Sequence, residues 1–154
     1  MNGKKIQILL VEDNPDHAEL LRRNLESLPA PVQLHQVADG EAALDYLFGR
    51  THFADRATFP LPDVMFLDWR LPRLDGMEVL RQVKNHPATA QLLVVVLTTS
   101  DASRDLDTAI RLRADQFLTK PADVPALEKL FLSLGFNLPK VTAPRPAPTP
   151  NSPA

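Results

Sequence analysis

The most constraining feature of the sequence is a regular alternation between short apolar runs and segments with helical spacing. The apolar runs occupy residues 6–11, 32–37, 64–67, 92–97 and 117–118, and apolar residues recur every three or four positions after each of them. Continuous apolar runs are typical of strands in parallel sheets, because helices cover both faces of such sheets. The sequence therefore predicts an α/β fold built from five strand-helix units.

Helix start and stop signals agree with this periodicity. Asn14 precedes Pro15 at the start of the first helical segment, and Gly135 follows the last one. Five such units fit a flavodoxin-like (βα)5 fold, a doubly wound parallel sheet with strand order 2-1-3-4-5. In this fold ligands bind at the carboxyl ends of strands 1 and 3, where the winding reverses. Functional residues are therefore expected directly after Val11 and Leu67.

Composition narrows the class of protein. The chain has 154 residues, of which 44% are hydrophobic and 23% charged, and its formal net charge is -2; these values suit one globular domain and argue against a nucleic-acid partner. The absence of cysteine excludes disulfides, thiolate metal sites and cysteine nucleophiles. The apolar runs are too short to span a bilayer. We therefore expect a cytoplasmic protein with neither a nucleic-acid nor a membrane partner.

Two segments fall outside the alternation. Residues 49–62 form a long connection for a compact domain, and the sequence leaves open whether they contact a partner or are an inert surface loop. Residues 139–154 contain six prolines and are expected to be extended or disordered. The predicted organisation is one domain over residues 4–138, followed by a proline-rich tail.

Acidic residues follow two of the predicted strands. Glu12 and Asp13 come after the first strand and Asp68 ends the third, so the fold would bring their carboxylates together. Like charges at such distances either raise one another's pKa or recruit a cation. Because the site would offer only oxygen ligands, Mg²⁺ is the favoured ion.

A carboxylate beside a metal can act as a nucleophile toward phosphorus, provided that further groups neutralise the phosphoryl charge. Two such groups follow the remaining strands. Thr98 lies at the end of the fourth strand and Lys120 at the end of the fifth, and both ends are predicted at the same sheet edge as Asp68. The sequence therefore predicts a phosphoryl-transfer site at this edge.

This constellation resembles the receiver domain of two-component response regulators, and the resemblance covers residues 4–135. The sequence 97–100, LTTS, the long connection before the third strand and the sequence 134–139 further resemble the single-domain regulators that partner phytochrome-type histidine kinases. The motifs that carry the family resemblance are Glu12-Asp13, Asp68, Leu71-Pro72, Asp75-Gly76, Thr98 and Lys120-Pro121.

The resemblance implies a role for each site residue. Asp68 would be the phosphoacceptor, and Mg²⁺ would be bound by Asp13, Asp68 and the backbone carbonyl of Arg70, with Glu12 acting through water. Thr98 and Lys120 would contact the phosphoryl oxygens. In this family a threonine and an aromatic residue also report phosphorylation to the surface, and here they would be Thr98 and Phe117.

The implied function is that of a single-domain response regulator that accepts a phosphoryl group from a histidine kinase, with a homodimer as a further expectation. It would not be an enzyme beyond phosphotransfer to, and loss of phosphate from, its own Asp68. One alternative is a receiver-like interaction module that works without phosphorylation. Another is a phosphatase of the haloacid dehalogenase type, but such enzymes need a second acid two residues after the nucleophile, where this chain has Arg70.

Some positions stay outside the predicted site. Arg113 stands where the family commonly has glycine, which leaves the geometry of that turn open. Among the four histidines only His17, one turn into the first predicted helix, could approach the site. Trp69 is expected to be partly exposed, either shaping partner docking or packing against its loop.

Overall fold

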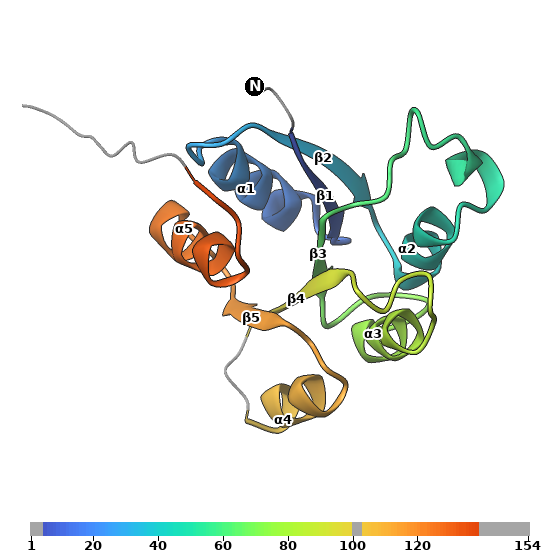
Figure 1. The fold of residues 1–154 in the computed structure, drawn as a ribbon. Helices are drawn as coiled ribbons and strands as arrows, with labels where there is room; N and C mark the ends of the chain where they lie inside the picture. The colour runs from blue at the N-terminus through green and yellow to red at the C-terminus, as the bar shows by residue number, and fades with distance from the viewer. Residues whose placement is uncertain (1–4, 100–102, 139–154) are drawn as a thin grey trace, which may run out of the picture.

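The computed structural model describes residues 5–99 and 103–138 and has the predicted flavodoxin-like architecture (Figure 1). Five parallel strands form one sheet in the order β2-β1-β3-β4-β5. In chain order the elements are β1 (Ile6–Val11), α1 (Pro15–Glu26), β2 (Val32–Val37), α2 (Gly40–Leu47), the 3-10 helix η1 (Thr51–Ala54), β3 (Val64–Asp68), α3 (Gly76–Lys84), β4 (Leu93–Thr98), α4 (Ser103–Arg111), β5 (Gln116–Thr119) and α5 (Val124–Ser133).

Helices cover both faces of the sheet, which explains why its central strands are apolar throughout (Figure 1). Side chains alternate along each strand. In β3, Met65 and Leu67 join the core cluster under α2 and α3, while Val64 and Phe66 join the cluster under α1 and α5. All four side chains are fully buried. Each core therefore takes every second residue of the same strands.

The register of the sheet places the carboxyl ends of the strands close together. Val11 of β1 pairs with Leu67 of β3, so the residues that follow both strands emerge side by side. Asp68 pairs in turn with Leu97 of β4. The pairing of the central strands therefore brings together the strand ends at which the sequence predicts functional residues.

Side-chain caps fix where the helices begin. The Asn14 side chain accepts hydrogen bonds from the backbone N–H groups of Asp16 and His17, and Pro15 occupies the first helical position of α1. Asp75 accepts from the backbone of Glu78 and caps α3, directly after the loop that follows β3. These caps satisfy backbone donors that a helix start leaves free, and they fix the helix registers near the site.

The long connection 49–62 is folded against the domain. It contains η1, and the buried Phe53 packs with Phe59 and Tyr46 in an aromatic group with ring centroids 5.1–5.9 Å apart. Arg56 donates hydrogen bonds to the backbone carbonyls of Tyr46 and Leu47 at the end of α2. The connection therefore shields one edge of the core, which gives its length a structural reason.

Arg113 adopts the conformation that a glycine would adopt more easily. Its φ is 70°, in the left-handed region. Its guanidinium donates hydrogen bonds to the backbone carbonyl of Lys84 and to the side chain of Asn85. The chain thus adopts a left-handed conformation at this turn without a glycine, and side-chain contacts of Arg113 accompany the strained backbone.

In the part of the chain that the structure describes, no helix is both long and apolar enough to cross a bilayer.

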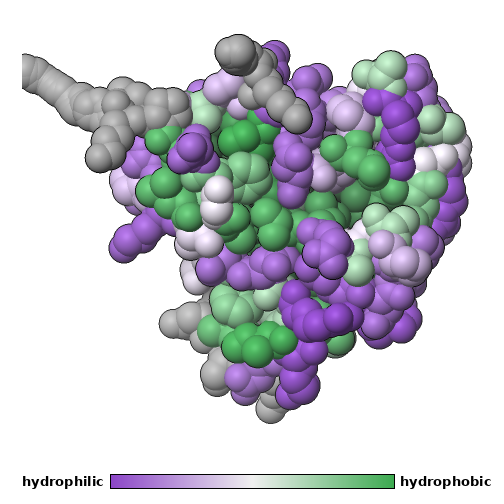
Figure 2. Space-filling view, in the orientation of Figure 1, coloured by the Kyte–Doolittle hydropathy of each residue, from purple (hydrophilic) through white to green (hydrophobic). Residues whose placement is uncertain are grey.

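The face drawn in Figure 2 carries hydrophobic residues over the sheet region between the helices and hydrophilic residues on the rim over α2 and α3. The prediction made for residues 139–154 lies outside the described residues. Among the residues that the structure describes, the clearly exposed large hydrophobic ones are Leu20, Leu61, Met77, Ile110 and Leu132.

Candidate functional site

Three carboxylates meet at the carboxyl edge of the sheet, as the sequence predicted. Glu12 and Asp68 are almost fully buried, with 2% and 4% of their surface exposed, whereas Asp13 faces solvent. Each of the three offers an oxygen atom, and these atoms all lie within 4.8 Å of one another. A hard cation fits this all-oxygen cluster, because nitrogen and sulfur ligands are absent from it. The cluster can therefore hold a metal ion.

Lys120 supplies the positive charge of the site. It follows β5, and its backbone N–H donates to the carbonyl of Thr98 over 2.8 Å, which ties the ends of β4 and β5 together. Its Nζ lies 2.6 Å from Oε1 of Glu12 and 3.2 Å from Oδ2 of Asp68, with 11% of the side chain exposed. The peptide bond between Lys120 and Pro121 is cis. One ammonium group thus bridges both buried carboxylates.

Burial sets the electrostatics of Asp68. Loss of solvent raises the pKa of its carboxyl group, the adjacent Glu12 side chain raises it further, and the hydrogen bond from the backbone N–H of Arg70 and the charge of Lys120 lower it. The net effect is a raised pKa of Asp68, so without a bound metal the charged carboxylate form is disfavoured. A cation bound among the three acids would stabilise that form.

The remaining predicted site residues surround this cluster. Thr98 ends β4 and is 4% exposed, and Phe117 of β5 is half-buried against the core cluster under α2 and α3. Arg70 is exposed, and its backbone N–H donates to Oδ1 of Asp68 over 3.1 Å. The structure therefore places Arg70 and Lys120 in contact with Asp68. Thr98 ends the neighbouring strand β4, and Phe117 lies two strands away on β5.

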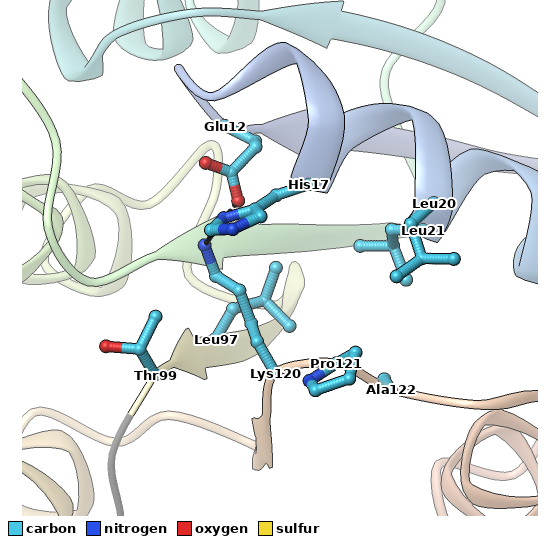
Figure 3. A pocket seen from close by; sticks show the side chains of 9 residues that line it. All are labelled: Glu12, His17, Leu20, Leu21, Leu97, Thr99, Lys120, Pro121 and Ala122. Atoms are coloured by element: carbon cyan, nitrogen blue, oxygen red, sulfur yellow. Dashed lines mark hydrogen bonds and ion pairs between the residues drawn. The ribbon is translucent and has the colours of Figure 1, made fainter.

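A pocket of about 320 Å³ opens beside the site, between α1 and the segment after β5 (Figure 3). His17 and Lys120 point toward one another across it, with Nδ1 of His17 3.1 Å from Nζ of Lys120. The sequence indicated only that His17 could approach the site. The contact itself joins residues far apart in the chain, and the placement of His17 in the first turn of the helix was the only signal for it. The lining residues are Glu12, His17, Leu20, Leu21, Leu97, Thr99, Lys120, Pro121 and Ala122.

The expectation that Trp69 is partly exposed was wrong. Only 7% of its surface is exposed, and it belongs to the core cluster under α2 and α3. The loop after Asp68 folds back so that the backbone N–H of Gly76 donates to the carbonyl of Trp69. A Cβ atom at Gly76 would lie 2.6 Å from the carbonyl oxygen of Asp68 and 2.9 Å from Cα of Trp69. This close approach, which only glycine permits, accompanies the burial of the indole.

Comparison with known families decides the assignment of this geometry. The family model of the response regulator receiver domain matches residues 8–131, from β1 to α5. The chain belongs to the response regulator receiver domain family. The match confirms the predicted family, and the buried acids, Thr98 and Lys120 lie within the matched span of this receiver domain.

Relatives of the receiver domain include a response regulator and a probable regulatory protein. The chain is 33% identical over 138 residues to the response regulator Rcp1 of Synechocystis sp., covering 89% of this chain and 92% of Rcp1. It is 42% identical over 122 residues to a probable methanogenesis regulatory protein, FilR2, of Methanothrix harundinacea, covering 79% of this chain and 76% of FilR2.

Solved structures agree with these relatives. The phosphorylated cyanobacterial phytochrome response regulator RcpA is 31% identical and superposes with a TM-score of 0.75, covering 89% of this chain and all of RcpA. The Mn²⁺-bound form of Rcp1 is 33% identical with a TM-score of 0.71, covering 90% of this chain and 99% of that chain. The receiver domain is thus homologous to phytochrome response regulators, one of which, RcpA, was solved in its phosphorylated form. Switching that depends on phosphorylation is expected for the family.

Proposed function

We propose that Asp68 accepts a phosphoryl group from a histidine kinase, and that its phosphorylation switches the contacts of this receiver domain. The observation that supports this most directly is the placement of Asp68. It is a buried carboxylate whose two oxygens accept hydrogen bonds from the backbone of Arg70 and from Lys120. It lies at the carboxyl edge of the sheet, and the neighbouring Asp13 is exposed to solvent.

The transfer needs a nucleophile and a route for the leaving group. The bond between phosphorus and the histidine nitrogen of the kinase breaks, and its electron pair returns to the imidazole, which takes up a proton. A carboxylate oxygen of Asp68 forms the new bond to phosphorus. Lys120 contributes by placing its ammonium within hydrogen-bond reach of the incoming phosphoryl oxygens. Water later attacks the phosphorus, breaks the bond to Asp68 and releases phosphate, which is the only turnover proposed for this chain.

The metal proposed for this site is Mg²⁺. Asp13, Asp68 and the backbone carbonyl of Arg70 would hold it, and Glu12 would bind it through water. The buried acids support this, since two of the three lose solvent and gain from a hard cation among their oxygens. When bound, the ion supplies charge neutralisation for the phosphoryl oxygens. The Mn²⁺-bound structure of Rcp1 supports a divalent ion in this class of protein.

The switch is proposed to involve Thr98 and Phe117. A phosphoryl group on Asp68 adds negative charge and new acceptor oxygens beside the end of β4. The Thr98 hydroxyl can donate to these oxygens, and the half-buried Phe117 lies on the strand that pairs with β4. The change would reach the face formed by α4, β5 and α5, where a downstream protein or a second copy would bind.

The wider setting is also part of the proposal. The domain spans residues 4–138 and is followed by a proline-rich tail, it acts in the cytoplasm, and its kinase is of the phytochrome type. The similarity to Rcp1 and RcpA supports the kinase class. The net charge of -2 gives no support to a nucleic-acid partner.

The test is phosphorylation by a small phosphodonor such as acetyl phosphate, followed by intact-protein mass spectrometry. We expect a mass gain of one phosphoryl group that requires Mg²⁺, is absent in Asp68→Asn and is present in Asp107→Asn, which removes an exposed carboxylate on α4. The single tryptophan gives a second readout, because Trp69 adjoins the acceptor and its fluorescence should change on Mg²⁺ addition. Equal phosphorylation of Asp68→Asn would refute the assignment.

The two alternatives give different results in this assay. A phosphorylation-independent interaction module would gain no mass from any donor while still binding its partner. A phosphatase of the haloacid dehalogenase type would release phosphate from added esters continuously, and the residue two positions after its nucleophile would be acidic. The exposed Arg70 occupies that position here, so the observation favours the phospho-switch.

A further inference from the structure

The ammonium group of Lys120 has three hydrogen-bond partners, and one of them is neither an acid nor part of the metal cluster. An ammonium carries three N–H donors and no acceptor. Nζ lies 2.6 Å from Oε1 of Glu12, 3.1 Å from Nδ1 of His17 and 3.2 Å from Oδ2 of Asp68. The three donors are therefore all used, and His17 takes one of them.

The chemistry of this contact fixes which atom accepts the hydrogen bond. Because Lys120 can only donate, Nδ1 of His17 must be the acceptor. The place of His17 follows from the start of α1, where the Asn14 side chain accepts the backbone N–H of His17 over 3.1 Å. This cap holds His17 on the turn that faces the end of β5 (Figure 3).

We propose that His17 is a positioning residue for Lys120 in phosphoryl transfer to Asp68, an inference that rests on the proposed function. Glu12 and His17 together hold two of the three N–H groups of the ammonium. The third then points to Oδ2 of Asp68, at 3.2 Å. Once phosphorus bonds to Asp68, this third donor is the one free to turn to a phosphoryl oxygen. Without His17 the flexible lysine keeps only one anchor besides the acceptor itself.

The experiment compares substitutions of His17 that keep or remove an acceptor near the Nδ1 position. His17→Ala and His17→Phe remove it, and the second retains a ring. His17→Asn keeps it, because the amide oxygen of asparagine lies about where Nδ1 does. The rate of phosphorylation by acetyl phosphate at saturating Mg²⁺ is the main readout. His52→Ala, an exposed histidine on η1, is the matched control.

We expect the rate to fall roughly 3- to 10-fold in His17→Ala and His17→Phe, which corresponds to the loss of one hydrogen bond to a partly exposed charged group. His17→Asn should recover most of the rate, and His52→Ala should match the wild type. The Mg²⁺ dissociation constant and the urea midpoint of the His17 variants should stay at wild-type values, since His17 is exposed and is not a proposed ligand.

The outcomes separate this inference from the proposed function. If His17→Ala reacts at the wild-type rate while Asp68→Asn is inert, the role of His17 is refuted and the function stands. If the asparagine variant fails to recover the rate, or if the rate falls in step with the urea midpoint, His17 is structural and the inference is refuted. If the wild type takes up no phosphate, or Asp68→Asn takes up as much, both proposals fall.

Discussion

Lys120→Met should destabilise the metal-free protein, because the ammonium group of Lys120 faces two buried carboxylates. The substitution keeps most of the side-chain volume and removes the charge. Glu12 and Asp68 would then be two adjacent carboxylates with side chains only 2% and 6% exposed, facing no buried cation. Removing one partner from a buried ion pair costs about 3–5 kcal/mol. We expect about 3 kcal/mol, since 11% of the lysine side chain reaches solvent.

Mg²⁺ should reverse part of this loss. An ion at 100 times its dissociation constant stabilises a protein by about 2.7 kcal/mol, and in Lys120→Met it also neutralises the carboxylates that the lysine no longer faces. The free energy gained from Mg²⁺ should therefore be larger in the variant than in the wild type. Urea unfolding followed by far-UV circular dichroism, in excess chelator and again in excess Mg²⁺, measures both quantities.

Lys129→Met is the matched control, because Lys129 is an exposed lysine on α5 remote from the acids. It should change the free energy of unfolding by less than about 0.5 kcal/mol in either condition. The reasoning is wrong if Lys120→Met unfolds like this control in chelator. It is also wrong if Mg²⁺ raises the free energy of unfolding of Lys120→Met by less than that of the wild type, because the two buried acids would then not need a cation to offset their charge.

Three further expectations concern the scaffold. Burial raises the pKa of Tyr46 to about 12, so the fold favours the neutral phenol, and the free energy of unfolding should fall as the pH rises from about 10 to 12. An absorbance titration of this single tyrosine checks the pKa, and titration at pH 10 would contradict the prediction. Arg113→Gly should be more stable in urea than Arg113→Ala by about 1 kcal/mol, since glycine alone relieves the φ of 70°; equal midpoints would contradict this. Gly40→Ala should lower the free energy of unfolding by about 1–3 kcal/mol, because its Cβ would lie 1.9 Å from the carbonyl oxygen of Leu74. A wild-type urea midpoint would contradict this, since the loop at Leu74 would then move aside.

The sequence predicts most of the site because backbone pairing aligns the ends of parallel strands. Once the apolar runs are recognised as neighbouring strands, Asp68, Thr98 and Lys120 must emerge at one edge, whatever their side-chain geometry. Strand pairing gives Asp68 opposite Leu97 and Thr98 opposite Thr119. The position of the acids was therefore predictable without knowledge of a single side-chain contact.

Features that depend on how loops fold were not predictable in the same way. Trp69 follows the end of the third predicted strand and was expected to be partly exposed, but the return of the chain at Gly76 buries the indole against the core. The contact between His17 and Lys120 depends on the register of α1, which the Asn14 cap fixes, and on the conformation of a long side chain. Arg113 shows the same limit, because its side-chain contacts are not visible in the local sequence.

The most direct test of the central claim is the identity of the phosphorylated residue. After reaction with acetyl phosphate and Mg²⁺, borohydride reduces an aspartyl phosphate to homoserine, and peptide mass spectrometry locates the change. We expect homoserine at position 68 and at no other aspartate, and none without Mg²⁺. Homoserine at Asp13 or another aspartate, or an unchanged Asp68 in protein that has gained phosphate, would contradict the account.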